Sequence, residues 1–473
     1  MSMYPKYEIV GAASIYLLLS LYYEKWQKIL LLVIDYILNS FMTLKPIAYL
    51  SIGAAYKSLR QNIEVQPQAE LISVLESYGR VLSEDVISDV NIPMYDSSHM
   101  DGFAVLANDI KHASDSGPIT LKLVRNVGLG KVPSDVLHSG QACRISTGGY
   151  LPQGADTVVP VEYTHKSKDN VGILAALPKG SFVSPLGKDV RRDSLLLNRG
   201  NILRGQDVAL LAMVRITRVP VFRKPRVAII PTGDELTDNL NEIKSGKILN
   251  TNSHIISRLV QECGGVSLDL GVTPDNVNKV RKKIRFALEK NDMILTTAGS
   301  SVGEYDVVEQ SINSLGRPGV LAHGVKLDRG RVAGVGALKG KPVIILPGPI
   351  QGAVNAFIAF AQPLLQYLSG LPEFNGLRIA GILTEKWEAR KKFKNFTKIA
   401  YVNAWLSKEG NVKATPITGE TAMMTVLSKA NGYLLLPEKT TTIEAGEKVY
   451  INVLPGLSYT SGHSASFLRR GYL

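Results

Sequence analysis

Carboxylate, hydroxyl and glycine residues follow two apolar runs in the second half of the chain, in a pattern suited to binding phosphate and a divalent cation. Pro231–Glu235 comes directly after Val227–Ile230, and Ala298–Asp306 comes directly after Met293–Thr297. Carboxylate oxygens are ligands that Mg²⁺ prefers, and a glycine-rich turn before a helix binds phosphate through backbone N–H groups. The candidate residues are Thr232, Gly233 and Asp234 in the first loop, and Gly299, Ser301, Gly303 and Asp306 in the second.

Two more polar loops leave predicted strands of the same region. Asn250–Ser253 follows Lys247–Leu249, and Pro347–Pro349 follows Pro342–Leu346. Ligands of open α/β sheets bind at the carboxyl ends of the strands, so we expect the four loops to meet at one edge. For any single loop, helix capping is the stronger interpretation. The four together predict a phosphate-and-metal site for an anionic ligand.

Motifs of several common enzyme classes are missing from the sequence. Neither a Walker A motif nor G-x-G-x-x-G occurs at these strand ends, which disfavours an ordinary NTPase or a dinucleotide-binding enzyme. H-E-x-x-H is also missing, and the only two cysteines, Cys143 and Cys263, are far apart. This disfavours a zinc hydrolase and excludes a disulfide framework. So few cysteines favour a reducing compartment, and we expect a cytoplasmic protein.

The net charge points to an anionic partner. The 473 residues, enough for about three domains, include 54 Lys and Arg against 41 Asp and Glu, a balance of +13. Such an excess favours nucleotide, phosphate, nucleic acid or anionic lipid as a ligand, although a solvated basic surface would give the same count. No aromatic residues interleave with the basic ones in a stacking motif, so we expect no nucleic-acid partner.

The periodicity of apolar residues predicts a multidomain α/β protein. Strands alternate with helices over 226–371, which predicts a doubly wound, mostly parallel α/β domain. Short β-branched runs predict a β lobe at about 96–184, inserted in an N-terminal composite domain over 42–225, and further short strands predict a β-barrel over 372–455. Within the composite domain we expect a helix around Gln68–Tyr78 and a basic linker over Arg215–Pro225.

The two ends of the chain do not fit this pattern. The uncharged run Ile9–Tyr23 has 15 residues, fewer than the roughly 20 that span a bilayer. Residues 1–41 are therefore open to three interpretations: a membrane anchor, a hydrophobic helical hairpin, or translated upstream sequence before a start at Met42. We favour the last and expect no membrane association. Residues 456–473 read as a polar tail.

Five ordered motifs between about Leu44 and Val453 resemble the molybdopterin molybdotransferase family, which includes MoeA and the E domain of gephyrin. They are Ser98–Ala104, Thr147–Val159, Pro231–Leu236, Asn252-Ser253 and Ser301–Asp306.

The resemblance implies an enzyme of molybdenum cofactor biosynthesis. It implies Mg²⁺-dependent insertion of molybdate, or tungstate, into the dithiolene of adenylylated molybdopterin, with release of AMP. The implied protomer has an elongated N-terminal α+β part with the inserted β lobe, a molybdopterin-binding α/β domain and the C-terminal β-barrel. It forms a homodimer whose active cleft is shared between the subunits.

The same resemblance assigns roles to residues. Asp234 and Asp306 are expected to bind Mg²⁺ and to act in catalysis, together with Asp101 and Asp156 contributed across the dimer. The expected ligand-binding residues are Thr147, Thr232, Gly233, Ser253, Gly299, Ser301, Gly303, Arg329, Arg331 and Gly348.

The chain departs from the family pattern at three places. Arg329–Val332 stands for a Pro-Gly-Lys-Pro loop implicated in oxyanion binding, Pro349–Gly352 lacks an Asn and a Ser, and Lys188 replaces a glutamate. Guanidinium groups suit oxyanions, so Arg329 and Arg331 remain candidates for molybdate. The alternatives are a diverged archaeal- or bacterial-type paralogue that binds pterin or nucleotide without turnover, and a scaffold.

Overall fold

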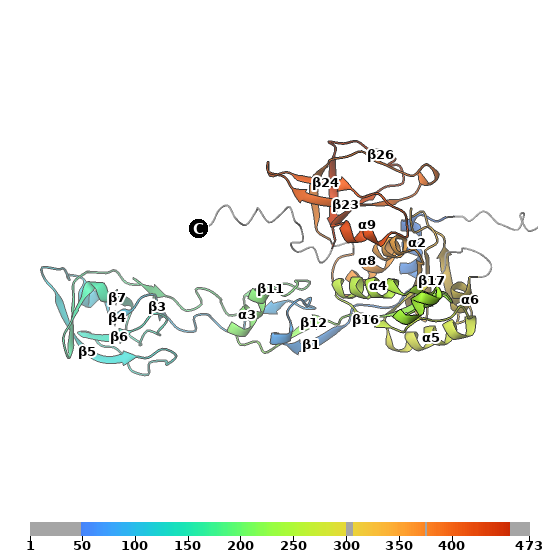
Figure 1. Cartoon of the computed structure of the whole chain (residues 1–473). Coiled ribbons are helices and arrows are strands. Elements are labelled where there is room, and N and C mark those ends of the chain that lie inside the picture. The colour runs from blue at the N-terminus through green and yellow to red at the C-terminus, as the bar shows by residue number, and fades with distance from the viewer. Residues whose placement is uncertain (1–48, 299–305, 374–375, 455–473) are drawn as a thin grey trace, which may run out of the picture. The chain divides into compact units, whose positions relative to one another are not determined.

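The computed structural model describes residues 49–298, 306–373 and 376–454 and divides into two compact units (Figure 1). One contains the described residues up to Val65, Arg226–Pro363, and those from Gly376 onward; the other contains Gln66–Pro225 and Leu364–Asn375. The N-terminal extension 1–41, the tail 456–473, and the candidates Gly299, Ser301 and Gly303 lie outside the described residues. Within the described ranges, every helix is too short or too polar to cross a bilayer.

A six-stranded sheet forms the centre of the first unit, in the order β16-β13-β17-β20-β19-β18. The first four strands are parallel, and β19 and β18 continue the sheet antiparallel. The strands are β13 (Arg226–Pro231), β16 (Val266–Asp269), β17 (Met293–Ala298), β18 (Pro318–His323), β19 (Gly334–Leu338) and β20 (Lys341–Pro347). The doubly wound α/β domain is thus confirmed, with an antiparallel extension that the sequence did not predict.

Helices cover both faces of this sheet. They are α2 (Ile52–Gln61), α4 (Thr251–Glu262), α5 (Val277–Lys290), α6 (Val307–Asn313) and α7 (Ile350–Ala356), which continues through a π-helical turn (Phe357–Ala361) into α8 (Gln362–Leu368). Val280, Ile284 and Leu288 lie on one face of α5 and pack on β13 and β17, since residues four apart share a helix face. The central strands β13 and β20 are mostly apolar because both of their faces are buried. A short parallel pair, β14 (Leu236–Thr237) and β15 (Ile248–Leu249), precedes α4.

The C-terminal strands close into a five-stranded barrel, in the order β21-β24-β23-β25-β27, which confirms the predicted barrel. Leu383, Val402, Ala414, Leu434 and Ile451 are among the residues that fill it. The elements are β21 (Arg378–Leu383), β22 (Trp387–Glu388), β23 (Lys398–Leu406), β24 (Val412–Pro416), α9 (Met424–Lys429), β25 (Gly432–Leu436), β26 (Thr442–Ile443) and β27 (Lys448–Val453).

The second unit contains the predicted β lobe, a six-stranded sheet in the order β7-β4-β6-β5-β9-β8. Its strands are β4 (Gly102–Val105), β5 (Ile119–Val127), β6 (Gln141–Ile145), β7 (Thr157–Pro160), β8 (Thr164–Lys166) and β9 (Asn170–Ile173). The strands β3 (Ser97–Ser98) and β10 (Val183–Ser184) pair beside it.

The rest of this unit corrects two expectations. Gln68–Tyr78 is not a helix: β1 (Ala69–Ser73) occupies its first half, followed by a 3₁₀ turn (Val74–Glu76). The expected linker over Arg215–Pro225 contains β12 (Arg218–Phe222), which pairs antiparallel with β1. Each strand satisfies the backbone of the other, and this pairing outweighs the local helical pattern. β2 (Val86–Ile87), β11 (Leu195–Leu197) and α3 (Gly205–Met213) complete the unit.

Candidate functional site

The loop Arg329–Val332 joins β18 to β19 in a fixed, unusual backbone conformation. Arg329 has a φ of 53°, in the left-handed region that side chains other than glycine rarely adopt. Gly330 is required for space, since a Cβ there would lie 2.6 Å from the side chain of Leu327. Backbone hydrogen bonds from Val325 N to Arg331 O (2.9 Å) and from Ala333 N to Gly330 O (2.9 Å) close the loop.

Two buried amide side chains of α7 hold this loop from below. Asn355 Nδ2 lies 3.3 Å from the carbonyl oxygens of both Asp328 and Arg329, and Asn355 Oδ1 accepts a 2.7 Å bond from Tyr401 Oη. Gln351 Oε1 accepts a 2.8 Å bond from Arg329 Nη1. Gln351 stands where the family pattern differs, so this departure from the pattern supplies the group that orients Arg329.

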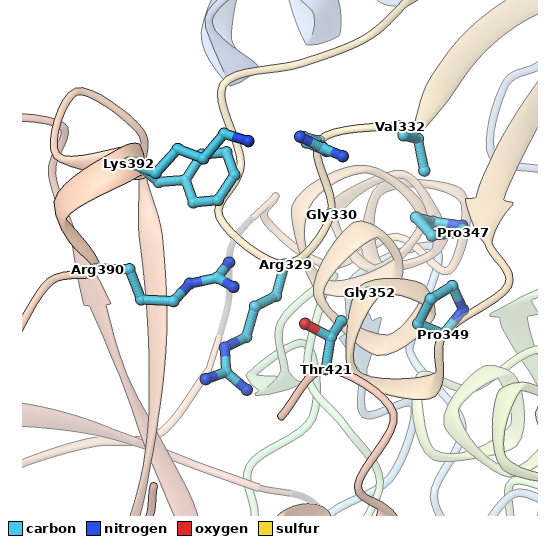
Figure 2. A pocket seen from close by; sticks show the side chains of 11 residues that line it. Arg329, Gly330, Val332, Pro347, Pro349, Gly352, Arg390, Lys392 and Thr421 are labelled. Atoms are coloured by element: carbon cyan, nitrogen blue, oxygen red, sulfur yellow. The ribbon is translucent and has the colours of Figure 1, made fainter. Parts of the chain in front are cut away.

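A cavity of about 350 Å³ opens above the loop, between the α/β domain and loops that connect the barrel strands. Figure 2 shows Arg390 and Lys392 on one side, Pro347 and Pro349 on the other, and Arg329 between them. The lining residues are Arg329, Gly330, Arg331, Val332, Pro347, Pro349, Gly352, Arg390, Lys392, Phe393 and Thr421. Both oxyanion candidates of the sequence therefore line one cavity, beside the two prolines that flank Gly348.

The cavity wall carries four cationic side chains and no carboxylate. The Phe393 ring lies between two of them, with the guanidinium carbon of Arg390 4.7 Å and that of Arg331 5.6 Å from the ring centroid. Such cation–π contacts hold two like charges near each other. Just behind the wall, Asp328 forms an ion pair with Arg390.

The positive charge of the cavity is only partly balanced by the carboxylates next to it. Arg329 is half-buried, and burial lowers its pKa, with the positive charge of Arg390 acting in the same direction. Asp328 opposes these effects but is already paired with Arg390. Crowded, partly desolvated cations of this kind favour an anionic ligand.

The predicted metal residues lie in a second polar region, at the carboxyl ends of β13 and β17. Asp234 Oδ1 accepts a 3.2 Å bond from Asp275 N. Asp306 is the N-cap of α6, and its Oδ1 accepts bonds from Val308 N (2.9 Å) and Glu309 N (3.0 Å). Burial raises the pKa of Asp275, as do the negative charges of Glu235, Asp234 and Asp306. Asp234 and Asp306 thus contribute to one region of negative potential, which favours a cation.

The donor set fits Mg²⁺ bound together with a substrate. In the described part of the chain no three His, Cys, Asp or Glu side chains form a group that could hold a metal. Mg²⁺ usually binds through one or two carboxylates plus phosphate oxygens and water, so two aspartates suffice. Nearby, the buried hydroxyls of Thr232, Thr296 and Thr297 have no hydrogen-bond partner among the described residues. Their hydroxyls are therefore available to a polar ligand.

Other predicted residues in this unit have structural partners. Ser253 is fully buried, and its Oγ accepts a 2.7 Å bond from Asn250 Nδ2, whose side chain caps α4. Gly348 O accepts a 2.6 Å bond from Asn252 Nδ2, which connects two of the four predicted loops. Gly233 has a φ of 152°, and a Cβ there would lie 2.7 Å from the carboxylate of Glu235, so the tight turn requires glycine.

The β lobe brings Asp101 and Thr147 together but separates Asp101 from Asp156. Asp101 Oδ1 accepts bonds from Thr147 N (2.7 Å) and Oγ1 (3.1 Å), which lower the pKa of the Asp101 carboxyl. Asp156 Oδ1 accepts a 2.7 Å bond from Ala107 N. The two aspartates flank opposite ends of the β4–β7 ladder, roughly 17 Å apart at about 3.4 Å per residue.

Sequence reasoning missed the wall that the barrel side contributes to the cavity. Arg390, Lys392, Phe393 and Thr421 line it, yet none was a candidate. The basic run Arg390–Lys392 was the available signal, but isolated charge runs are usually solvated. Their role depends on contacts with a loop some 60 positions earlier, such as the 2.8 Å bond from Asp328 N to Thr397 O.

Comparison with known proteins assigns a family to each part of the chain. Residues 50–214 match "MoeA N-terminal region (domain I and II)", residues 228–367 match "Probable molybdopterin binding domain", and residues 380–454 match "MoeA C-terminal region (domain IV)".

Individual relatives agree with these matches over most of their length. The molybdopterin molybdenumtransferase of Bacillus subtilis is 32% identical over 397 residues, which cover 82% of this chain and 91% of the relative. That of Staphylococcus epidermidis is 29% identical, covering 84% and 93%. The crystal structure of a molybdopterin biosynthesis MoeA protein from Pyrococcus horikoshii superposes with a TM-score of 0.75 at 29% identity, covering 86% of this chain and 99% of that one. The chain therefore belongs to the MoeA family of molybdopterin molybdenumtransferases, enzymes of molybdenum cofactor biosynthesis.

Proposed function

We propose that this enzyme inserts molybdate into the dithiolene of adenylylated molybdopterin, with Mg²⁺-dependent release of AMP. The observation that carries the proposal is the cavity lined by Arg329, Arg331, Arg390 and Lys392. Molybdate is a compact dianion, and a volume of about 350 Å³ leaves room for it together with part of an organic ligand. Guanidinium groups bind such oxyanions through paired, charge-assisted hydrogen bonds.

The pyrophosphate of the substrate would bind at the carboxyl ends of β13 and β17. Asp234 and Asp306 would hold Mg²⁺, and Thr232 and Gly233 would contact the phosphates, as would Gly299, Ser301 and Gly303. When bound, Mg²⁺ neutralises charge on the phosphate oxygens and so favours cleavage of the pyrophosphate linkage. The aspartates fix the position of that charge, since Asp306 is held by two backbone N–H groups.

We further propose that the enzyme acts as a homodimer with a cleft shared between subunits. In this arrangement the β lobe of one subunit, with Asp101, Thr147 and Asp156, serves the α/β domain of its partner. The exposed Asp101 carboxyl, kept ionised by Thr147, supports a role in contacts with a ligand or cation.

The decisive experiment replaces Asp306 by asparagine and follows AMP release from adenylylated molybdopterin with Mg²⁺ and molybdate. Asparagine caps a helix as well as aspartate does, so Asp306→Asn keeps the start of α6 while removing the negative charge. We expect AMP release to fall at least about 100-fold, while the melting temperature stays near that of the wild type. Asp306→Ala would lose the cap as well.

The matched control is Asp115→Asn, which changes an exposed aspartate in the β lobe and leaves the rate unchanged. Wild-type protein that binds molybdate but releases no AMP would overturn the proposed turnover. AMP release that survives in Asp306→Asn would remove Asp306 from the metal site.

A further inference from the structure

The side chain of His323, at the end of β18, lies between the two halves of the site and is only 6% exposed. Its Nδ1 is 2.5 Å from Glu309 Oε2, and its Nε2 is 3.9 Å from Asp306 Oδ2. Asp306 is the N-cap of α6, and Glu309 lies in its first turn. One imidazole therefore faces the proposed metal ligand and a second carboxylate next to it.

The backbone of His323 is joined to the loop of the cation-lined cavity. His323 pairs with Gly334 in the β18–β19 ladder, directly after the segment whose Val332 lines that cavity. The residues after His323 are bonded to the same loop, since Gly324 N donates to Ala333 O (3.0 Å) and Val325 N donates to Arg331 O (2.9 Å). His323 is thus fixed to the segment that carries Arg331.

These contacts differ from those of a histidine that merely fills the core. A packing residue needs one hydrogen bond or none, whereas this ring faces two carboxylates of α6 while its backbone is paired with β19, next to the cavity loop. Residues that orient a ligand-binding group from behind typically change metal affinity or activity 10- to 100-fold when they are removed.

We propose that His323, anchored by Glu309, is a positioning residue. It holds Asp306 and the Arg329–Val332 loop at a fixed distance from each other, and with them the metal-binding and oxyanion-binding parts of the site. The proposal rests on the function proposed above, because it takes Asp306 as a metal ligand and the cavity as the molybdate site. His323 itself touches neither ligand.

The test measures each half of the site separately, on the full-length protein and without turnover. Molybdate binding is followed by equilibrium dialysis, and cation binding by the electron paramagnetic resonance signal of free Mn²⁺, used in place of Mg²⁺. We expect His323→Gln to raise both dissociation constants about 10-fold. Glu309→Gln, which keeps the shape of the side chain, should raise both in the same direction.

The double variant separates a shared role from two independent ones. If Glu309 acts only through His323, His323→Gln with Glu309→Gln weakens binding no more than His323→Gln alone. The matched control is Ser311→Ala, which removes a buried hydroxyl on α6 that bonds Val307 O (2.6 Å) and Val277 O (3.1 Å). It should lower the melting temperature and leave both dissociation constants unchanged.

Two results would overturn the proposal: both constants of His323→Gln within twofold of the wild type, or a change in one constant alone. Failure of the proposed function has a different signature, namely wild-type protein that binds neither molybdate nor Mn²⁺, or binds both and releases no AMP.

Discussion

At the scale of single residues, the cation-lined cavity depends on Arg329 being held in a costly backbone conformation. A side chain other than glycine in the left-handed region costs of order 1 kcal/mol, and the bonds from Asn355 and Gln351 offset that cost. The amides of α7 therefore shape the cavity indirectly, by fixing the carbonyls and the guanidinium of the loop.

Replacing Asn355 should destabilise the fold more than removing the hydroxyl of Tyr401, which donates a hydrogen bond to Asn355. Asn355→Leu leaves the Asp328 and Arg329 carbonyls and the buried Tyr401 hydroxyl without their partner. We expect a loss of about 2–3 kcal/mol in the free energy of unfolding by urea, against about 1 kcal/mol for Tyr401→Phe, which removes one bond. Equal losses would mean that the loop contacts contribute little.

Replacing Arg331 should weaken molybdate binding without affecting the fold. Arg331 is exposed and contacts the face of Phe393, so Arg331→Ala removes a cation from the cavity and little packing. We expect the molybdate dissociation constant to rise at least about 10-fold, and Arg331→Lys to give an intermediate value, since lysine keeps the charge but not the paired donors. Arg285→Ala, at an exposed position of α5, serves as the control, and an effect of equal size there would indicate a non-specific charge effect.

At the scale of elements, the charge of Asp207 stabilises the first turn of α3. Asp207 Oδ2 accepts bonds from Arg204 N (2.9 Å) and Nε (2.8 Å), and these contacts lower the pKa of the Asp207 carboxyl. A carboxyl whose pKa is lower in the folded than in the unfolded state stabilises the fold at pH values above its unfolded pKa, here 3.8. This stabilisation is lost as the pH falls through the pKa of the folded state.

Asp207→Asn should therefore lower the melting temperature by about 2–4 °C at pH 7, and the difference from wild type should shrink below pH 4. Thermal unfolding followed by circular dichroism between pH 7 and pH 3 measures this difference. A gap that stays constant or widens toward pH 3 would show that the charge of Asp207 is not what supports α3.

The elements that the sequence predicts well are those whose pattern is local. The strand at Val227–Ile230 and the helix at Asn276–Lys290 are confirmed because continuous or periodic burial is visible in one segment. β18 and β19 were missed because they contain Gly319, Gly334 and Gly336 and have no alternating pattern. A Cβ at Gly336 would lie 2.5 Å from Gly319 O, so these glycines permit a close pairing that only the partner strand reveals.

The site follows the same division. Asp234, Asp306, Arg329 and Arg331 could be proposed from the sequence because each lies in a loop after a predicted strand or in a family motif. His323 and Arg390 could not, because their contacts reach across the fold: His323 lies at the end of a missed strand, and Arg390 lies between β22 and β23 of the barrel region.

At the scale of the whole molecule, the cavity belongs to two parts of the chain that fold around different cores. Its loop comes from the α/β sheet, whereas Arg390, Lys392, Phe393 and Thr421 come from the region that closes into the barrel. Backbone bonds such as Gln351 N to Thr421 O (3.1 Å) join the two parts.

Because both parts line the cavity, the melting temperature should report whether an anion is bound there. An anion held from both sides is lost when either part unfolds, so its binding free energy adds to the stability of both. At 100 times the dissociation constant the gain is about 2.7 kcal/mol, or roughly 5–10 °C in the melting temperature. Differential scanning calorimetry with tungstate or molybdate should show one sharper, later transition for this unit, while Arg331→Ala, with its dissociation constant raised at least about 10-fold, shows at most about half of the shift. On the proposed function, a bound oxyanion joins the barrel to the sheet, and we expect the enzyme to unfold at a lower temperature in a cell short of molybdate.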